Sequence, residues 1–478
     1  MANNNISGCR RQWLGAVALS FIILVAALLT PAFRVNAADE TRPNMVFIIS
    51  DDHRWDALGA AGNPKIHTPV LDQMAKDGAY FRQATIHVPQ CTPSRASLLT
   101  GLPPHQHGYF SNQYQRADVE TSERFSGALL PEILRESGYR TILVGKWHLP
   151  QQPWSCGFTD VRVWMTGGSG PYLNARLAEG KSRQTKVFKG FTNEVFANDA
   201  IEFLKSEAAQ EKPFFLWLAA TAPHTPLKPT PTHIETLYQG KERSDLLPPG
   251  FPGNIGAGDF KHYYQAVSHL DEQVGRVLKT LKESRLDTNT IVVFLGDNGF
   301  MMGSRGIGER GGGGKVVPYE ESVRVPLIVR APTNFKIAAL RGSSNAPVSS
   351  LDLPSTFLQL AGVTPPTTWS GRDLRALLRG EKNHGITEAF CEFADNQSER
   401  FGELAYRLVR TPTHKLIVWE KTNKPHELYD LAADPRETRN LINDPAQQPM
   451  IRKMMDNLRV WMKKTNDPFL HRLQHPPA

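Results

Sequence analysis

Short apolar runs that alternate with longer amphipathic stretches constrain the fold of this chain most. The runs are "NMVFIIS" (44–50), "RTILVG" (140–145), "PFFLWLA" (213–219), "TIVVFLG" (290–296) and "VPLIVRAP" (325–332). Continuous apolar runs of this length are typical of strands buried on both faces. Helical apolar spacing occupies stretches between them, such as 68–81 and 262–284. The alternation predicts an α/β fold with a large, mixed but mostly parallel sheet sandwiched by helices.

The pattern changes after "LDLPSTFLQLAGV" (351–363). The segments "AYRLVRTPTHKLIVWE" (405–420) and "HELYDLAADPRETRNL" (426–441) indicate hairpins, and a helix is expected around 447–464. We therefore expect a main domain over residues 38–380 and a smaller α+β subdomain with an antiparallel sheet over 381–478. Two Pro-rich stretches, 223–231 and 247–253, predict surface loops.

The first 37 residues have the pattern of a secretory signal peptide. Arg10 and Arg11 precede an apolar run from about Trp13 to Leu29, and Val35-Asn36-Ala37 resembles a cleavage site. A retained membrane anchor is the alternative, since the run is nearly long enough to span a bilayer. We expect export to the periplasm or medium, by the general secretory or the twin-arginine route, without a stable anchor.

Three of the four cysteines follow this segment: Cys91, Cys156 and Cys391. An odd number in an exported protein leaves at least one thiol unpaired. Whether Cys156 and Cys391 pair is left open by the sequence, and Cys91 is the natural unpaired residue.

Cys91 stands at the start of an expected helix, in "PQCTPSRASLLTG" (89–101). Thr92 is a plausible N-cap, Pro93 a plausible first helical residue, and Gly101 suits the position just past the end. Arg95 lies four residues after the cysteine, so the sulfur would meet both a helix N-terminus and a guanidinium. This setting favours a reactive group, whereas a buried structural cysteine is the alternative.

Acidic and amide side chains follow two of the expected strands, as Asp51-Asp52 and as Asp297-Asn298. Ligands of open α/β sheets bind beyond the carboxyl ends of the strands, so these groups can converge. Their oxygens form a hard-donor set suited to Ca²⁺ or Mg²⁺. The alternative is that they only cap turns.

Basic side chains also lie just past expected strands: Lys146, His148, His224 and Lys315. Each alone is typical of an ordinary surface or hydrogen-bonded residue. The glycine run before Lys315 is no P-loop, because Glu309 replaces the first glycine and Val316 replaces the Ser or Thr. A flexible loop that delivers a lysine is the better interpretation.

The motif "CTPSRASLLTG" resembles the signature of the type I sulfatases, in the alkaline-phosphatase-like superfamily. The core Cys-x-Pro-x-Arg of that signature directs conversion of the cysteine to formylglycine. Further segments resemble the family in the same order: "NMVFIISDDHRWDALG", "LPEILRESGYRTILVGKWHL", "APHTP", "GDNG", "KVVPYEESVRVPLIV" and "ELYDLAADPRETRNL". One departure is Gly303-Ser304-Arg305-Gly306, where many relatives have Gly-Glu-His-Gly.

The resemblance implies a formylglycine made from Cys91 by a maturation enzyme, and a divalent cation, usually calcium, with magnesium as the alternative. It implies that the metal site comprises Asp51, Asp52, Asp297, Asn298 and the residue derived from Cys91. It further implies that the sulfate pocket is lined by Arg95, Lys146, His148, His224 and Lys315. In the implied reaction Asp297 accepts the proton of the attacking hydroxyl, His224 protonates the leaving alcohol, and His148 accepts the second hydroxyl's proton.

The expected activity is hydrolysis of sulfate esters, on a sulfated small molecule or glycan. The nearest alternative is a formylglycine-dependent phosphonate or phosphate ester hydrolase. Zinc phosphatases fit less well, because they favour Ser or Thr as nucleophile and Asp-His in place of Asp297-Asn298. A secreted calcium-binding or glycan-binding protein without catalysis is the non-enzymatic alternative. Nucleic acid is not an expected partner, since basic and acidic residues are interleaved and no binding module is recognisable.

Overall fold

The computed structural model describes residues 42–112, 125, 127–251, 259–308, 314–394, 405–420 and 424–474, with backbone only for 424–426, 472 and 474. The expected signal peptide and most of the glycine run before Lys315 lie outside these residues. Within the described part, no helix combines the length and the apolar character needed to cross a membrane.

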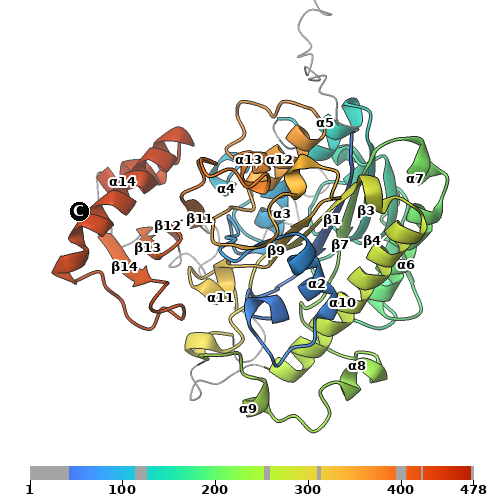
Figure 1. The fold of residues 1–478 in the computed structure, drawn as a ribbon, viewed down its shortest axis with the longest axis horizontal. Coiled ribbons are helices and arrows are strands. Elements are labelled where there is room, and N and C mark those ends of the chain that lie inside the picture. The colour runs from blue at the N-terminus through green and yellow to red at the C-terminus, as the bar shows by residue number, and fades with distance from the viewer. Residues whose placement is uncertain are drawn as a thin grey trace, which may run out of the picture.

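Two separate sheets organise the chain (Figure 1). The strands are β1 (Asn44–Ser50), β2 (Ala79–Phe81), β3 (Arg140–Lys146), β4 (Asp160–Met165), β5 (Arg176–Glu179), β6 (Thr185–Val187), β7 (Phe214–Ala219), β8 (Thr290–Gly296), β9 (Leu327–Arg330), β10 (Gly342–Ser344), β11 (Ala389–Phe393), β12 (Tyr406–Arg410), β13 (His414–Trp419) and β14 (Lys424–Asp430). The larger sheet has ten strands in the order β10-β2-β9-β8-β1-β7-β3-β4-β5-β6. Its five central strands, from β8 to β4, are parallel, and antiparallel pairs extend it on both sides. The predicted mixed, mostly parallel sheet is confirmed.

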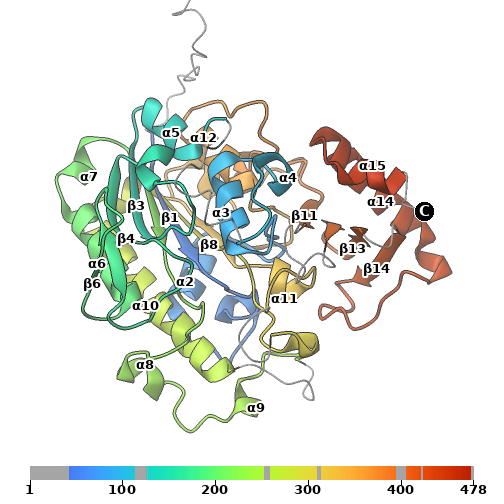
Figure 2. The ribbon, with the colours of Figure 1, turned by 180° about the vertical axis from the view of Figure 1, so that it is seen from behind.

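Helices cover both faces of this sheet. The α-helices are α2 (Pro69–Asp77), α3 (Cys91–Thr100), α4 (Pro104–His107), α5 (Leu130–Glu136), α6 (Thr192–Lys205), α7 (Ala208–Glu211), α8 (Thr232–Thr236), α9 (Arg243–Leu246), α10 (Phe260–Glu283), α11 (Glu320–Val323), α12 (Asp352–Leu360), α13 (Arg375–Leu378), α14 (Gln448–Lys464) and α15 (Phe469–Gln474). Figure 1 shows α2, α6 and α10 on the near face, and Figure 2 shows α3 and α5 on the other.

The buried strand β1 illustrates why two layers of helices are needed. Its side chains alternate between the faces, so Val46 and Ile48 join the core under α2, α6 and α10. Phe47 belongs to the opposite core, where its ring lies 5.1 Å from that of Phe357 in α12. A strand that is apolar on both faces must be covered on both, as the sequence predicted.

The helical prediction for residues 68–81 is wrong at its end, because α2 stops at Asp77 and residues 79–81 form β2. Gly78 adopts an extended conformation, and a Cβ at this position would lie 2.4 Å from the carbonyl oxygen of Val329. Only glycine allows this approach to β9. Residues 79–81 then form a strand between β9 and β10, and the aromatic residues Tyr80 and Phe81 favour strands.

The second sheet is antiparallel, with the order β11-β12-β13-β14, as predicted for the C-terminal part. One face carries α14, whose Met454 and Leu458 pack with Leu416. The boundary at residue 380 stays a prediction; β11 begins at Ala389. Cys156 and Cys391 are both buried and are not disulfide-bonded to each other.

A buried ion network joins the second sheet to the main body. Glu320, at the start of α11, accepts hydrogen bonds from Arg410 of β12 at 2.8 and 3.2 Å and from Lys415 of β13 at 3.2 Å. The three side chains are at most 1% exposed. Although burial alone would raise the pKa of Glu320, the Arg410 and Lys415 charges hold it well below its usual range. Glu320 is therefore an anionic anchor for two buried cations.

Replacing Glu320 by alanine should destabilise the protein by about 3–5 kcal/mol, because Arg410 would remain buried without its carboxylate partner, while Lys415 would keep only Glu437. The matched control is Glu179→Ala, which removes one partner of an ion pair with Lys186 whose side chains are both more than half exposed. That change should cost at most about 1 kcal/mol. Denaturant unfolding of both variants measures the difference, and equal losses would contradict an anchoring role for Glu320.

Candidate active site

The carboxyl ends of the parallel strands place polar side chains around one centre. Asp51 and Asp52 follow β1, and Asp297 and Asn298 follow β8, its neighbour in the sheet. Lys146 is the last residue of β3. The loops after β3 and β7 carry the two histidines of the predicted site, and a loop before α11 carries its second lysine.

Helix α3 supplies Cys91, but the predicted start of this helix is wrong by two residues. The helix begins at Cys91 itself, and Gln90 is the N-cap residue, with extended φ/ψ and no side-chain cap. Pro93 is tolerated in the first turn because its missing N–H would have no helical partner. Gly101 ends the helix with φ of +64°, as predicted.

The side chain of Thr92 does not cap the helix, contrary to the prediction, but contacts the loop after β3. Its hydroxyl donates to the carbonyl oxygen of His148 at 3.0 Å, while its backbone N–H donates to the side chain of Asn112 at 2.9 Å. The first turn of α3 is thereby linked to the loop after β3.

The Cys91 sulfur lies at the centre of the buried charges. It is 3.3 Å from Asp51 Oδ1 and 2.9 Å from Lys315 Nζ, and the residue is fully buried. Burial, and then the Asp51 charge, raise the pKa of the thiol to about 12, against the opposing effect of Lys146 and Lys315. The unmodified sulfur is therefore a protonated thiol at neutral pH.

Two hydrogen bonds, one from the backbone and one from a side chain, hold the acidic residues together. The Asp52 N–H donates to Asp297 Oδ1 at 3.3 Å, and Asn298 Nδ2 donates to Asp52 Oδ1 at 2.6 Å. Asp52 has a φ of 62°, in the left-handed region that non-glycine residues rarely adopt. The surrounding contacts are what keep Asp52 in this conformation.

Each carboxylate has a cationic partner. Lys146 pairs with Asp51, and Lys315 Nζ lies 2.6 Å from Asp52 Oδ1. Arg95 donates twice to Asp297 Oδ2, at 2.8 and 3.0 Å. Arg95 also donates to the Lys146 carbonyl at 2.7 Å, and its side chain is fully buried. Arg95 therefore lies behind Asp297 and acts on the centre through that carboxylate.

The two central carboxylates differ in their pKa directions. Burial alone would raise the pKa of Asp51, but the neighbouring cations, Lys146 foremost, hold it far below its usual range. Burial, followed by repulsion from Asp51, raises the pKa of Asp297 to about 6, although Arg95 and Lys146 lower it.

The residues present fit a hard divalent cation. Asn298 Oδ1 is buried and has no hydrogen-bond partner within the described ranges, beside the carboxylates of Asp51, Asp52 and Asp297. A buried amide oxygen that accepts no hydrogen bond and lies beside carboxylates is suited to bind a cation. Ligand atoms of Cys91 and His224 also lie within 4.8 Å of those of Asp51 and Asp52. Their sulfur and nitrogen are softer donors, so the four oxygen-bearing side chains suit Ca²⁺ or Mg²⁺ better.

His224 is oriented by its own loop. Its Nδ1 lies 2.6 Å from the carbonyl oxygen of Thr225, which can only accept, so Nδ1 carries the proton. Nε2 lies 3.7 Å from Asp52 Oδ2, and the side chain is 19% exposed. Burial lowers the pKa of His224 despite the nearby Asp52 and Asp51 charges. His224 thus directs Nε2 to the centre.

His148 has a φ of 58°, and its carbonyl oxygen accepts the hydrogen bond from Thr92 in the first turn of α3. Its Nδ1 is buried and finds no hydrogen-bond partner among the residues that the structure describes. Burial, together with the Lys146 and Arg95 charges, lowers the pKa of His148 well below its usual value. Gly168 packs against the ring so closely that a Cβ there would lie 2.3 Å from Nε2. The imidazole is held neutral and closely confined.

Sequence reasoning missed Tyr263, which supports the acidic cluster from α10. Its hydroxyl donates to the carbonyl oxygen of Asp52 at 2.6 Å and accepts from the Arg54 N–H at 3.0 Å, and the residue is fully buried. The sequence places Tyr263 in a predicted amphipathic helix, but aromatic residues on such a face usually belong to the core. Only the fold shows that its hydroxyl reaches the Asp52 backbone.

The chain thus combines an α/β sheet, oxygen-bearing side chains at the strand ends and a buried cysteine in the first turn of an adjacent helix, and the comparisons place it among the hydrolases of the alkaline-phosphatase-like superfamily. The family model described as Sulfatase matches residues 43–363, and the model of the N-sulphoglucosamine sulphohydrolase C-terminal region matches residues 308–464. The chain belongs to the sulfatase family, whose members are sulfuric ester hydrolases.

Named relatives cover most of the chain. The ulvan-active sulfatase of Formosa agariphila is 29% identical over 448 residues, which is 92% of this chain and 84% of the relative. The N-acetylglucosamine-6-O-sulfatase of Bacteroides thetaiotaomicron is 27% identical, covering 94% of this chain and 92% of the relative. The crystal structure of the yidJ protein of Bacteroides fragilis superposes with a TM-score of 0.75 at 27% identity, over 92% of this chain and all of that one.

Removing the Tyr263 hydroxyl should weaken metal binding. Tyr263→Phe leaves the Asp52 carbonyl and the Arg54 N–H without a buried partner, which should cost about 1–3 kcal/mol of stability. Because Asp52 is then less well held, we expect roughly 10- to 100-fold lower affinity for Ca²⁺, measured by calorimetric titration of metal-stripped protein.

The neighbouring Tyr264→Phe is the matched control. Tyr264 is also fully buried on α10, but its hydroxyl accepts from Asn63 Nδ2 at 2.8 Å and, within the described ranges, forms no hydrogen bond with the acidic cluster. This variant should lose stability and keep its calcium affinity. A similar loss of affinity in both variants would show that the effect is merely structural.

Proposed function

We propose that this protein hydrolyses sulfate esters on carbohydrates, with a formylglycine formed from Cys91 and a bound Ca²⁺. The observation that carries the proposal is the placement of Cys91 as the first residue of α3, between the Asp51 carboxylate and the Lys315 ammonium. Membership of the sulfatase family implies both the formylglycine and a divalent metal. The names of the relatives, one active on ulvan and one on N-acetylglucosamine 6-O-sulfate, support a sulfated glycan as substrate.

The charges around Cys91 suit an anionic ester. A sulfate monoester carries a negative charge that would repel the carboxylates of the site. Lys146 and Lys315 already stand beside Asp51 and Asp52, so the positive charge is in place before the substrate arrives. A divalent cation held by Asp51, Asp52, Asp297 and Asn298 would add Lewis acidity toward a sulfuryl oxygen.

Formylglycine, as its hydrate, would supply two hydroxyls on one carbon, one to attack sulfur and one whose deprotonation allows sulfate to leave. Asp297 Oδ1, which faces Asp52 and the cluster, would accept the proton of the attacking hydroxyl. Arg95 keeps Asp297 in position through its two contacts with Oδ2.

The two histidines would act in different proton transfers, His224 as donor and His148 as acceptor. Since His224 Nδ1 is committed to the Thr225 carbonyl, Nε2 is the atom that would deliver a proton to the leaving alcohol. His148 is confined beside Lys146 and Gly168, and its neutral ring suits acceptance of the second hydroxyl's proton. Each such transfer contributes roughly 10²–10⁴-fold to the rate.

The alternatives can be separated by the substrate. A phosphonate or phosphate ester hydrolase would use the same cysteine and cations on a different ester. A non-catalytic calcium-binding or glycan-binding protein would lack a catalytic group, yet each group named above is present in the described site. We further propose export, on the basis of the signal-like residues 1–37.

The experiment that tests the function compares protein with and without the Cys91 modification on a panel of esters. Protein made together with a formylglycine-generating enzyme should hydrolyse members of a panel of sulfated sugars and aryl sulfates. Trypsin releases residues 83–95, and mass spectrometry should find the aldehyde in this peptide. Cys91→Ala should lose essentially all turnover.

Faster turnover of phosphonate monoesters than of every sulfate in the panel would favour the alternative hydrolase. Full sulfatase activity in protein whose peptide contains only unmodified thiol would contradict the formylglycine mechanism.

The leaving-group dependence should separate His224 from His148. A sugar alkoxide is strongly basic and needs a proton to leave, whereas a nitrophenolate does not. His224→Ala should therefore slow sugar-sulfate hydrolysis roughly 10²–10⁴-fold and nitrophenyl-sulfate hydrolysis only mildly. His148→Ala should show a burst of released alcohol followed by slow turnover, because a later step is impaired.

Pre-steady-state kinetics over a leaving-group series measures how the rate of each variant depends on the leaving alcohol. Equal losses for His224→Ala across the series would show that the proton roles are assigned wrongly.

A further inference from the structure

Helix α14 has two distinct faces. Met454, Leu458 and Met462 are buried against the antiparallel sheet. A second stripe at helical spacing, formed by Asn457, Val460, Trp461 and Lys464, faces a hollow between α14 and the main body. Val460 is the most exposed of the large apolar side chains among the described residues, at 68%. Val460 is therefore not part of the apolar contact that holds α14 on the sheet, whereas Trp461 also packs against that core.

The hollow has an inner and an outer part, which we call together the α14 groove. The inner cavity of about 220 Å³ lies between Trp461 and Lys464 on one side and Ser349, Asp352 and Arg372 on the other. The outer part, of about 860 Å³, extends along α14 past Lys453. Glu388 and Asn457 line both parts, so the two adjoin. An elongated ligand would fit this shape better than a single small molecule.

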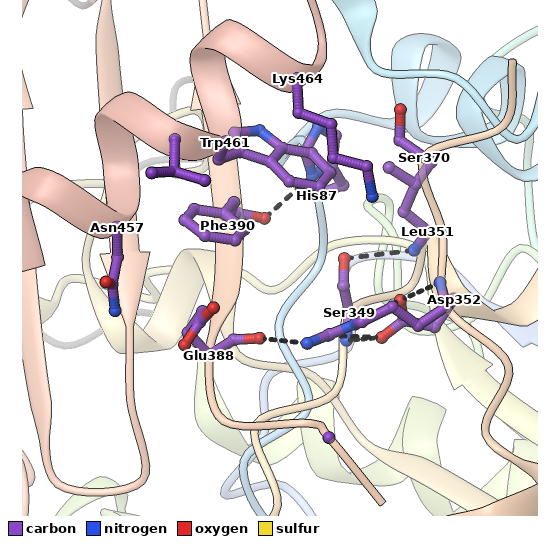
Figure 3. Close-up of a pocket in the computed structure, with 13 residues that line it drawn as sticks. His87, Ser349, Leu351, Asp352, Ser370, Glu388, Phe390, Asn457, Trp461 and Lys464 are labelled. Atoms are coloured by element: carbon purple, nitrogen blue, oxygen red, sulfur yellow. Dashed lines mark hydrogen bonds and ion pairs between the residues drawn. The ribbon is translucent and has the colours of Figure 1, made fainter.

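The inner cavity combines an aromatic surface with polar groups. The ring of Trp461 stacks on that of Phe390, with centroids 4.6 Å apart and planes 9° apart (Figure 3). The figure also shows the Lys464 side chain extending from α14 across the cavity toward Leu351. On the floor, Arg372 is fixed by Asp352 at 2.8 Å and by the Glu388 carbonyl at 2.8 Å. Aromatic rings beside carboxylates and hydroxyls suit the alternating apolar and hydroxyl-bearing surfaces of sugar rings.

The charge of α14 indicates what kind of sugar polymer would bind. Its 17 residues include five basic side chains and one acidic: Arg452, Lys453, Arg459, Lys463 and Lys464 against Asp456. Lys453 and Lys464 line the groove, and within the described ranges neither ammonium group has a hydrogen bond or ion pair. The basic side chains of the lining outnumber its two carboxylates, Asp352 and Glu388, so the exposed ammonium groups complement an anionic chain.

We propose that the α14 groove is a second glycan-binding site that holds a sulfated polysaccharide chain, separate from the Cys91 centre, with which it shares no lining residue. The choice of a sulfated glycan over other polyanions rests on the proposed function, together with the Trp461 and Phe390 surface. The site would bind the polymer while single esters are hydrolysed elsewhere.

The test compares two double variants that remove the same charge from the same helix. Lys453→Ala with Lys464→Ala removes the cations that line the groove. Arg452→Ala with Lys463→Ala removes two exposed cations of α14 that do not line it. Each pair is introduced into protein carrying Cys91→Ala for binding, and into otherwise unchanged protein for kinetics. The probes are ulvan and heparin, their chemically desulfated forms, and long-chain polyphosphate.

We expect the groove variant to bind the sulfated polysaccharides at least about tenfold more weakly, and the control variant to bind within about twofold of the parent. Both should retain the parent kcat/KM on nitrophenyl sulfate. Trp461→Ala should also weaken binding to the desulfated chains, since it removes the aromatic surface rather than charge.

Equal losses in the two double variants, no loss in the groove variant, or equal binding of polyphosphate and sulfated glycan would each overturn the proposal. Failure of the proposed function has a different signature: nitrophenyl and sugar sulfates would remain unhydrolysed by the modified parent protein, whatever the groove binds.

Discussion

Three buried carboxylates from two neighbouring strands share one small site, and the repulsion between them has to be balanced. Asp51, Asp52 and Asp297 are each at most 2% exposed. Lys146, Lys315 and Arg95 each pair with one of them, from three different segments of the chain. A buried charge without a partner is costly, so this pairing determines where β3, α3 and the loop before α11 must lie. The cations that would attract a sulfate ester are thus the same cations that compensate the buried carboxylates when the site folds.

The pairing of Lys315 depends on a segment that the second sheet holds in place. Val316 has a φ of 69°, and its N–H donates to the Pro89 carbonyl, two residues before Cys91. Lys415 of β13 donates to the Pro318 carbonyl at 2.7 Å and also contacts Glu320. The residues from Lys315 to Glu320 are therefore held between the segment that leads into α3 and the antiparallel sheet. The C-terminal sheet contributes to the site by holding this segment, although it supplies none of the predicted site residues.

The sequence predicted those parts of the structure that depend on local pattern. Continuous apolar runs such as residues 44–50 can only be strands buried on both faces, and polar residues at their carboxyl ends then meet at one edge. Local patterns were insufficient where a residue far away in the sequence determines the conformation or the hydrogen-bond partner. Residues 79–81 leave the helical pattern because Gly78 can approach β9, and Gln90 precedes α3 because Asn112 satisfies the Thr92 N–H instead of a cap. Tyr263 and Glu320 were missed for the same reason, since their partners lie about 100 to 200 residues away in the sequence.

The cations of the Cys91 centre and those of α14 differ in a way that limits what each can bind. In the centre every cation has a carboxylate within hydrogen-bond distance, in surroundings that exclude water, so a single ester experiences strong and directed electrostatics. On α14 the ammonium groups are exposed and screened within about 8 Å at physiological salt, and one exposed contact contributes little. A weak contact becomes useful when a polymer repeats it, because each further contact is then intramolecular. A groove that is open at its outer part and lined by exposed lysines is therefore suited to chains, whereas the buried centre is suited to one ester at a time.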